Sequence, residues 1–191
     1  MEHAKEYIER SRQGLVTAGE GLAEKQWSFK PSPECWSIAE ILEHVALTNE
    51  MILGHVCKLL AAAPPPPADH GRDRDQIDAL IVNGFPDRSA KFKGPEGLMP
   101  TGRPTPSESL GRLNQSCAGL AQYLDATPDL REHAVDSPPL KAVSRGAYQF
   151  IDGYQLMLAM GGHMQRHTRQ ILEVKAGANF PVHEDSHVPA A

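Results

Sequence analysis

Proline- and glycine-rich segments divide the chain into four long stretches in which apolar residues recur at intervals of three and four. This spacing places the apolar side chains on one face of an α-helix. The stretches cover residues 2–24, 37–63, 106–126 and 146–176. No window alternates apolar and polar residues between turn signals, which is the pattern of a half-buried strand. The periodicity therefore predicts an all-α protein built as a four-helix bundle.

Two of these helices have distinct start signals. Ser37 and Glu40 have the spacing of a capping box, in which each side chain bonds a backbone amide of the first turn. Thr105 and Glu108 repeat that spacing, and Pro106 stands at the first helical position, where an amide hydrogen is not needed. We therefore expect the second helix to begin at residue 37 and the third near residue 106.

Two connections separate the predicted helices. Residues 64–104 begin with four prolines and are rich in glycine and charge, so we expect mostly a loop. One short apolar patch, at Ile77, Leu80, Ile81 and Val82, predicts a single short helix there. Residues 127–145 also carry turn signals and are expected to form a loop. The length of the first connection frees the second and third helices from being neighbours joined by a tight turn. The whole length suits one domain, expected over residues 1–180, with a frayed tail over residues 181–191.

Composition excludes several classes of protein. The chain has 19 Lys and Arg against 24 Asp and Glu, and no basic cluster interleaved with aromatic residues, so we expect no nucleic-acid partner. No run approaches the roughly 18 apolar residues of a membrane span, and the N-terminal segment lacks an apolar signal core. Cys35, Cys57 and Cys117 are far apart and are expected to be reduced core thiols. These features predict a cytoplasmic protein that does not bind membranes.

Two histidines lie one helical turn apart on the apolar face of the last predicted helix. His163 and His167 project from the same side of that helix. The other members of the stripe are Leu156, Met160, Met164, Ile171 and Val174. Two imidazoles removed from water must either find partners in a polar core or share a cation. The spacing alone leaves both interpretations open.

His44, on the flank of the apolar stripe of the second helix, is the best candidate for a third ligand. Three histidines would leave an open position for water or substrate, as in catalytic zinc sites. A partly solvated surface histidine is the alternative. His55 lies three turns further along that helix, too far to bind the same ion. Among the other histidines, His3, His70 and His133 show no spacing signal.

Two other metal sites are disfavoured. Residues 183–187 match the His-Glu-x-x-His pattern of metalloproteases, but that chemistry requires the motif on a helix, and this stretch lies between Pro181 and Pro189. A ferritin-like di-iron centre requires a Glu-x-x-His motif on each of two helices and further glutamates. The sequence shows no such second set. The internal histidines therefore remain the candidate site.

The chain resembles the DinB-like superfamily in two motifs. They are WSIAEILEH at residues 36–44 and HMQRHTRQI at residues 163–171, the latter followed by NFP at residues 179–181. The resemblance covers nearly the whole chain in element order, although residues 64–104 depart from it. It implies an up-down-down-up bundle topology, a divalent metal held by the three histidines discussed above, and homodimers.

The resemblance also implies a class of activity. Some members are transferases or isomerases that use low-molecular-weight thiols such as mycothiol, bacillithiol or glutathione, and many have no known activity. We therefore expect a Zn²⁺ or Ni²⁺ site that activates a thiolate for attack on a small-molecule substrate. Glu43 or Gln170 would orient a ligand histidine, unless they are surface residues. A metal-dependent hydrolase and a non-catalytic metal- or ligand-binding stress-response protein are the alternatives.

Overall fold

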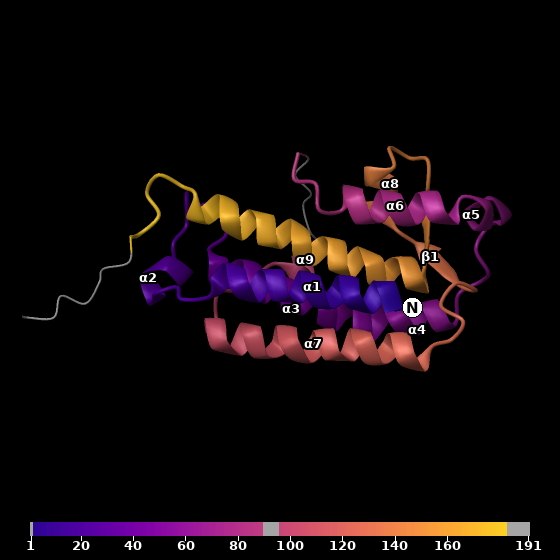
Figure 1. Cartoon of the computed structure of the whole chain (residues 1–191), viewed down its shortest axis with the longest axis horizontal. Coiled ribbons are helices and arrows are strands. Elements are labelled where there is room, and N and C mark those ends of the chain that lie inside the picture. The colour runs from indigo at the N-terminus through magenta and orange to yellow at the C-terminus, as the bar shows by residue number, and fades with distance from the viewer. Residues whose placement is uncertain (1, 90–95, 183–191) are drawn as a thin grey trace, which may run out of the picture.

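The computed structural model describes residues 2–89 and 96–182, and within them the chain is mostly helical. The longest helices of this part run side by side along the long axis of the molecule (Figure 1). They are α1 (Glu2–Gly19), α3 (Ile38–Met51), α7 (Pro106–Ala126) and α9 (Gly153–Lys175). Helices α1 and α3 each pack against both α7 and α9. The apolar core lies where these helices face one another.

The two predicted capping boxes start α3 and α7 as expected. Ser37 Oγ accepts a hydrogen bond from the Glu40 amide at 3.2 Å, and the Glu40 carboxylate accepts one from the Ser37 amide at 2.8 Å. Thr105 and Glu108 make the same pair of bonds ahead of Pro106. Each box satisfies amide groups that a helix start otherwise leaves unpaired, so the local sequence sets where both helices begin.

The helix that starts with α3 continues as far as residue 61 with one change of register. A π-helical turn, η1 (Ile52–Val56), joins α3 to α4 (Cys57–Ala61). A π turn takes in one residue more than an α turn. The buried face is therefore shifted by one position. Leu60 is buried, whereas Leu59, seven residues after the buried Ile52 and on the same face of a regular α-helix, is 52% exposed.

The first helix is shorter than predicted, because it ends at Gly19 rather than near residue 24. Gly21 adopts a φ of +70°, a left-handed conformation that follows many helix ends and that glycine reaches without strain. A short helix, α2 (Glu24–Trp27), comes next. The Trp27 indole packs so closely on Gly19 that an added Cβ would lie 2.5 Å from the ring.

The prediction that the chain contains no strand was wrong. Strands β1 (Ala134–Asp136) and β2 (Phe150–Asp152) pair antiparallel, with Ala134 opposite Asp152. Each strand has three residues, which is too short for an alternating pattern to be visible in the sequence. The last helix consequently begins at Gly153 and not near residue 146, with Asp152 as its N-cap.

Both connections contain more helix than predicted. Outside residues 90–95, the first connection contains α5 (Ala68–Arg72), α6 (Arg74–Gly84) and a 3₁₀ turn, η2 (Glu96–Leu98). Helix α6 packs on α9, and its Ile77 and Ile81 are buried, in agreement with the apolar patch seen there. In the second connection, α8 (Pro138–Val143) packs on α6.

The burial of the cysteines agrees in part with the expectation that all three are core thiols. Cys57 and Cys117 are buried, whereas Cys35 is exposed in the loop before α3, and all three thiols are free. Within the two described ranges, no helix combines the length and apolar character that crossing a membrane requires. The tail expected over residues 181–191 lies outside the described residues after Val182.

Candidate metal centre

Three histidines lie together between the packed helices α3 and α9. His44 is on α3, and His163 and His167 are one turn apart on α9. Their candidate ligand atoms all lie within 4.8 Å of one another. The ring centroids are separated by 5.2, 4.8 and 4.4 Å. The structure therefore brings together the three residues that the sequence selected.

Burial keeps these imidazoles neutral. Desolvation lowers the pKa of His163 to about 3 and the pKa of His167 well below its ordinary value, and the neighbouring rings lower both further. Desolvation also lowers the pKa of His44, although a hydrogen bond to Leu98 acts in the opposite direction. At neutral pH each ring therefore has one unprotonated nitrogen, which is the form that binds a metal.

The hydrogen bond of His44 identifies the nitrogen that faces the cluster. His44 Nδ1 lies 2.8 Å from the backbone carbonyl oxygen of Leu98, in η2. A carbonyl only accepts, so Nδ1 carries the proton and Nε2 carries the lone pair. Leu98 is 54 positions away along the chain, and no sequence pattern marks it.

Gln170 accepts a hydrogen bond from His167, as Leu98 does from His44. It is one of the two residues that the sequence suggested would orient a ligand histidine. Its Oε1 lies 2.9 Å from His167 Nδ1. With the proton of that ring on Nδ1, its Nε2 carries a lone pair and lies 3.0 Å from Nε2 of His163. His44 and His167 thus both present Nε2 to the cluster.

The surroundings of His163 suit a shared cation. Its Nδ1 is buried and has no hydrogen-bond partner in the described part of the chain. Its Nε2 lies 3.0 Å from the Nε2 of His167. Two lone pairs at this distance repel unless a proton or a cation lies between them. A tetrahedral zinc with Zn–N distances of about 2.0–2.1 Å holds its nitrogens about 3.3 Å apart, which is close to the spacing of this pair. With His44 included, the ligand atoms lie within 4.8 Å of one another, so the three residues could hold a metal ion.

The Trp36 indole covers one side of the cluster. Its ring centroid lies 4.7 Å from that of His44 and 6.3 Å from that of His167, and it is stacked on His167 with an interplanar angle of 21°. Trp36 directly precedes Ser37, so the capping box that starts α3 also positions the indole. This aromatic wall shields two of the three rings from water.

Glu43 was expected either to orient a histidine or to lie on the surface, but it is buried and bonds the segment after η2 instead. Its buried carboxylate accepts hydrogen bonds from Thr101 Oγ1 at 2.7 Å and from the Gly102 amide at 2.8 Å. These bonds hold the segment that follows η2 against α3. Because η2 supplies the Leu98 carbonyl that bonds His44, Glu43 supports His44 through the backbone of this segment.

Replacing Glu43 with glutamine is expected to lower the free energy of unfolding by about 1–3 kcal/mol. A neutral amide can accept only one of the two bonds and loses the strength that the charge adds. Urea unfolding of the wild type and the variant measures this loss. Glu50→Gln is the control, because Glu50 lies on the same helix as Glu43 and its substitution weakens only a half-exposed ion pair with Arg112 of α7, which should cost less than about 1 kcal/mol. Equal losses in the two variants would contradict the role given to Glu43.

Other histidines lie apart from this cluster. His3 and His55 are exposed. His70, for which the sequence predicted a loop, is buried in α5, and its Nε2 lies 2.9 Å from Gln155 Oε1. The metalloprotease-like pattern at residues 183–187 lies outside the described residues.

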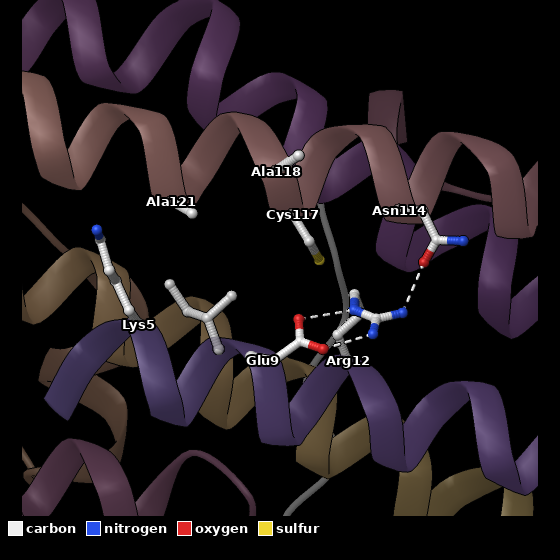
Figure 2. A pocket seen from close by; sticks show the side chains of 8 residues that line it. Lys5, Glu9, Arg12, Asn114, Cys117, Ala118 and Ala121 are labelled. Carbon is white, nitrogen blue, oxygen red and sulfur yellow. Dashed lines mark hydrogen bonds and ion pairs between the residues drawn. The ribbon is translucent and has the colours of Figure 1, made fainter. Parts of the chain in front are cut away.

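A cavity of about 280 Å³ lies between α1 and α7, and none of the three histidines lines it (Figure 2). Its lining includes Ile8, Cys117 and the Arg12 guanidinium, which bonds Glu9 and Asn114. Burial raises the pKa of the Cys117 thiol to about 12, so this group is not a thiolate at neutral pH. The cavity therefore offers no activated nucleophile, and the histidine cluster is the candidate functional site.

The architecture and the cluster define a class of protein: a mostly helical chain in which two helices present three neutral histidines that can hold a metal ion. A family model described as the DinB superfamily matches residues 7–171. Since this match spans most of the chain, the protein belongs to the DinB superfamily, as the motifs at residues 36–44 and 163–171 indicated. No curated protein and no solved structure matches the chain.

Proposed function

We propose that the protein holds one divalent cation, Zn²⁺ or Ni²⁺, through the Nε2 atoms of His44, His163 and His167. Three observations support this site. The ligand atoms lie within 4.8 Å of one another, burial keeps the rings neutral, and two of the rings have Nδ1 bonded to an acceptor. Imidazole nitrogens suit both metals. The resemblance to the superfamily implies the same three ligands.

We further propose that the protein is a thiol-dependent S-transferase. The observation that carries this proposal is that the cluster of described residues offers three ligands and not four, which leaves a position for an external ligand. When bound by these three neutral imidazoles, a divalent cation would keep its full charge and would favour the anionic form of a thiol at that position. The thiol would release its proton to solvent, its sulfur would form a bond to an electrophilic carbon of a second substrate, and the bond to the leaving group would break with the electron pair departing on that group.

The groups around the histidines hold two of the rings in the tautomer that can bind a metal. The Leu98 carbonyl and the Gln170 amide oxygen hold the Nδ1 protons of His44 and His167, so the lone pairs of both rings face the cluster. Trp36 covers one side of these two rings and excludes water there. The site is thus organised before any ligand enters it.

Metal-assisted hydrolysis is supported less well, because it requires a general base. Glu43 is adjacent to His44 in the sequence, but both of its carboxylate oxygens accept hydrogen bonds, from Thr101 and Gly102. It is therefore engaged in holding a backbone segment. A metal-binding protein without turnover would use the same three histidines, and only an activity measurement separates it from an enzyme.

We also propose the topology and assembly that the superfamily implies. Helices α1, α3, α7 and α9 would form an up-down-down-up four-helix bundle, which is supported by the packing of α1 and α3 against both α7 and α9. Residues 1–180 would form one domain of a cytoplasmic homodimer that acts on a small molecule and binds neither nucleic acid nor membrane. Light scattering after size-exclusion chromatography tests the dimer.

Turnover that requires both metal and thiol tests the proposed activity. Tag-free protein loaded with Zn²⁺ or Ni²⁺ would be incubated with mycothiol, bacillithiol or glutathione and with 1-chloro-2,4-dinitrobenzene as the electrophile. We expect product above the uncatalysed rate with at least one thiol for the wild type and none for His163→Ala. Turnover of ester substrates without a thiol would instead indicate a hydrolase. Retained metal without turnover would indicate a non-catalytic metal-binding protein.

A further inference from the structure

Arg88 lies beside the candidate centre and shares a hydrogen-bond acceptor with one of its histidines. It follows α6 in the chain, and its guanidinium contacts two side chains of α9. Its Nε and Nη2 donate to the two carboxylate oxygens of Glu173 at 2.8 and 2.7 Å, and its Nη1 donates to Gln170 Oε1 at 3.3 Å. The same Gln170 oxygen lies 2.9 Å from His167 Nδ1. One amide oxygen therefore accepts from both Arg88 and His167.

We propose that Arg88 is a positioning residue that acts through Gln170 to keep the proton of His167 on Nδ1 and its lone pair on Nε2. This inference rests on the proposed metal site and deepens it. A glutamine amide carries an acceptor oxygen and a donor nitrogen in nearly equivalent positions, so it can offer either one to a histidine. A guanidinium only donates, so the amide atom that faces Arg88 must be the oxygen. Since that oxygen also faces His167, the ring must donate to it through Nδ1.

Without Arg88, the Gln170 amide is free to turn over. Its NH₂ group would then donate to His167 Nδ1, and the ring proton would move to Nε2, the nitrogen that faces His163. A protonated nitrogen has no lone pair for a metal. His44 needs no equivalent residue, because a backbone carbonyl cannot exchange a donor for an acceptor. Loss of Arg88 is therefore expected to weaken metal binding about 10–100-fold, the usual effect of removing a group that orients a ligand.

Charge alone predicts the opposite effect. Arg88 is a cation close to the site, so its removal should strengthen the binding of a second cation if only electrostatic repulsion matters. Arg169→Met is the matched control. Arg169 also ties α9 to the segment after α6, through the Pro86 carbonyl at 2.9 Å, and its loss removes the same charge and a similar tether. We expect Arg169→Met to bind metal at least as tightly as the wild type.

Zn²⁺ competition titrations on tag-free protein test the proposal through a double-mutant cycle. A carboxylate accepts through both oxygens and needs no arginine to orient it, so Gln170→Glu should remove the dependence on Arg88. We expect Arg88→Met to weaken Zn²⁺ binding about 10–100-fold with Gln170 present, and less than about threefold with Gln170→Glu. Equal losses in the two backgrounds, or unchanged binding in Arg88→Met alone, would overturn the proposal.

The ring proton can also be located without any metal. Long-range ¹H–¹⁵N correlation spectra distinguish protonated from unprotonated ring nitrogens, and the His167 signals are assigned by their loss in His167→Gln. In the wild type we expect Nδ1 to be protonated, and in Arg88→Met we expect the form with the proton on Nε2 to predominate, because a tenfold loss of affinity requires about nine-tenths of the rings in that form. The same tautomer in both proteins would overturn the proposal. The expected change in a protein that binds no Zn²⁺ would support the role of Arg88 and reject the proposed function.

Discussion

Zinc or nickel is expected to raise the melting temperature of the wild-type protein by about 5–10 °C when free metal is present at about 100 times its Kd. A ligand that binds only the folded state stabilises it by mass action, by about 2.7 kcal/mol at that concentration. A protein of this size gains roughly 2–4 °C for each kcal/mol. Differential scanning calorimetry measures the shift, and EDTA should reverse it.

The same measurement on His44→Ala separates His44 from the pair on α9. This variant lacks one of the three proposed ligands, so its melting temperature is expected to change little with metal or with EDTA. His55→Ala is the control, because His55 is exposed in η1 and should leave the wild-type response intact. Equal responses from the wild type and His44→Ala would remove His44 from the site.

Adding a methyl group at Gly161 is expected to lower the free energy of unfolding by about 1–3 kcal/mol. Gly161 lies where α9 meets α1, and an added Cβ would lie 2.4 and 2.6 Å from two ring carbons of Tyr7. Tyr7 is only 2% exposed, so its ring has no solvent to move into and the two helices would have to separate. Urea and thermal unfolding of Gly161→Ala measure the effect.

Gly14→Ala is the matched control for this close approach, because Gly14 lies on α1 and faces α9 across the same interface. An added Cβ there would lie 3.6 Å from Thr168 Oγ1, which is an ordinary contact. Alanine is also favoured over glycine within a helix by up to about 1 kcal/mol, so Gly14→Ala should be neutral or stabilising. Similar stabilities of the two variants would contradict the close packing of α1 on α9.

Long periodic segments and their caps could be predicted from the sequence, whereas short elements could not. The capping boxes at residues 37 and 105 fixed two helix starts, since their bonds are local. Strands β1 and β2 have three residues each, and their pairing depends on contacts between distant segments. Leu59 is exposed although an α-helical wheel places it on the buried face with Ile41, because the π turn η1 adds one residue that the wheel does not include.

His163 and His167 could be selected from the sequence because helical periodicity places them on one face. His44 was selected as a candidate on the flank of the apolar stripe of its helix. The groups that hold them in place could not all be selected. Leu98 acts through its backbone carbonyl, so the identity of its side chain carries no signal. Arg88 reaches Gln170 across 82 positions, and that contact depends on how the end of α6 lies against α9. The spacing of residues along a helix indicates the metal-binding histidines, whereas the groups that hydrogen-bond these histidines are determined by tertiary contacts.

One divalent ion held by three histidine nitrogens is the feature on which the proposed activity depends. Elemental analysis of tag-free, metal-loaded protein, together with X-ray absorption at the zinc edge, measures its stoichiometry and its ligands. We expect about one ion per chain with three imidazole nitrogens at about 2.0–2.1 Å, and loss of the ion in both His163→Ala and His167→Ala. Wild-type protein without stoichiometric metal after loading, or variants that retain the ion with the same ligands, would contradict the site.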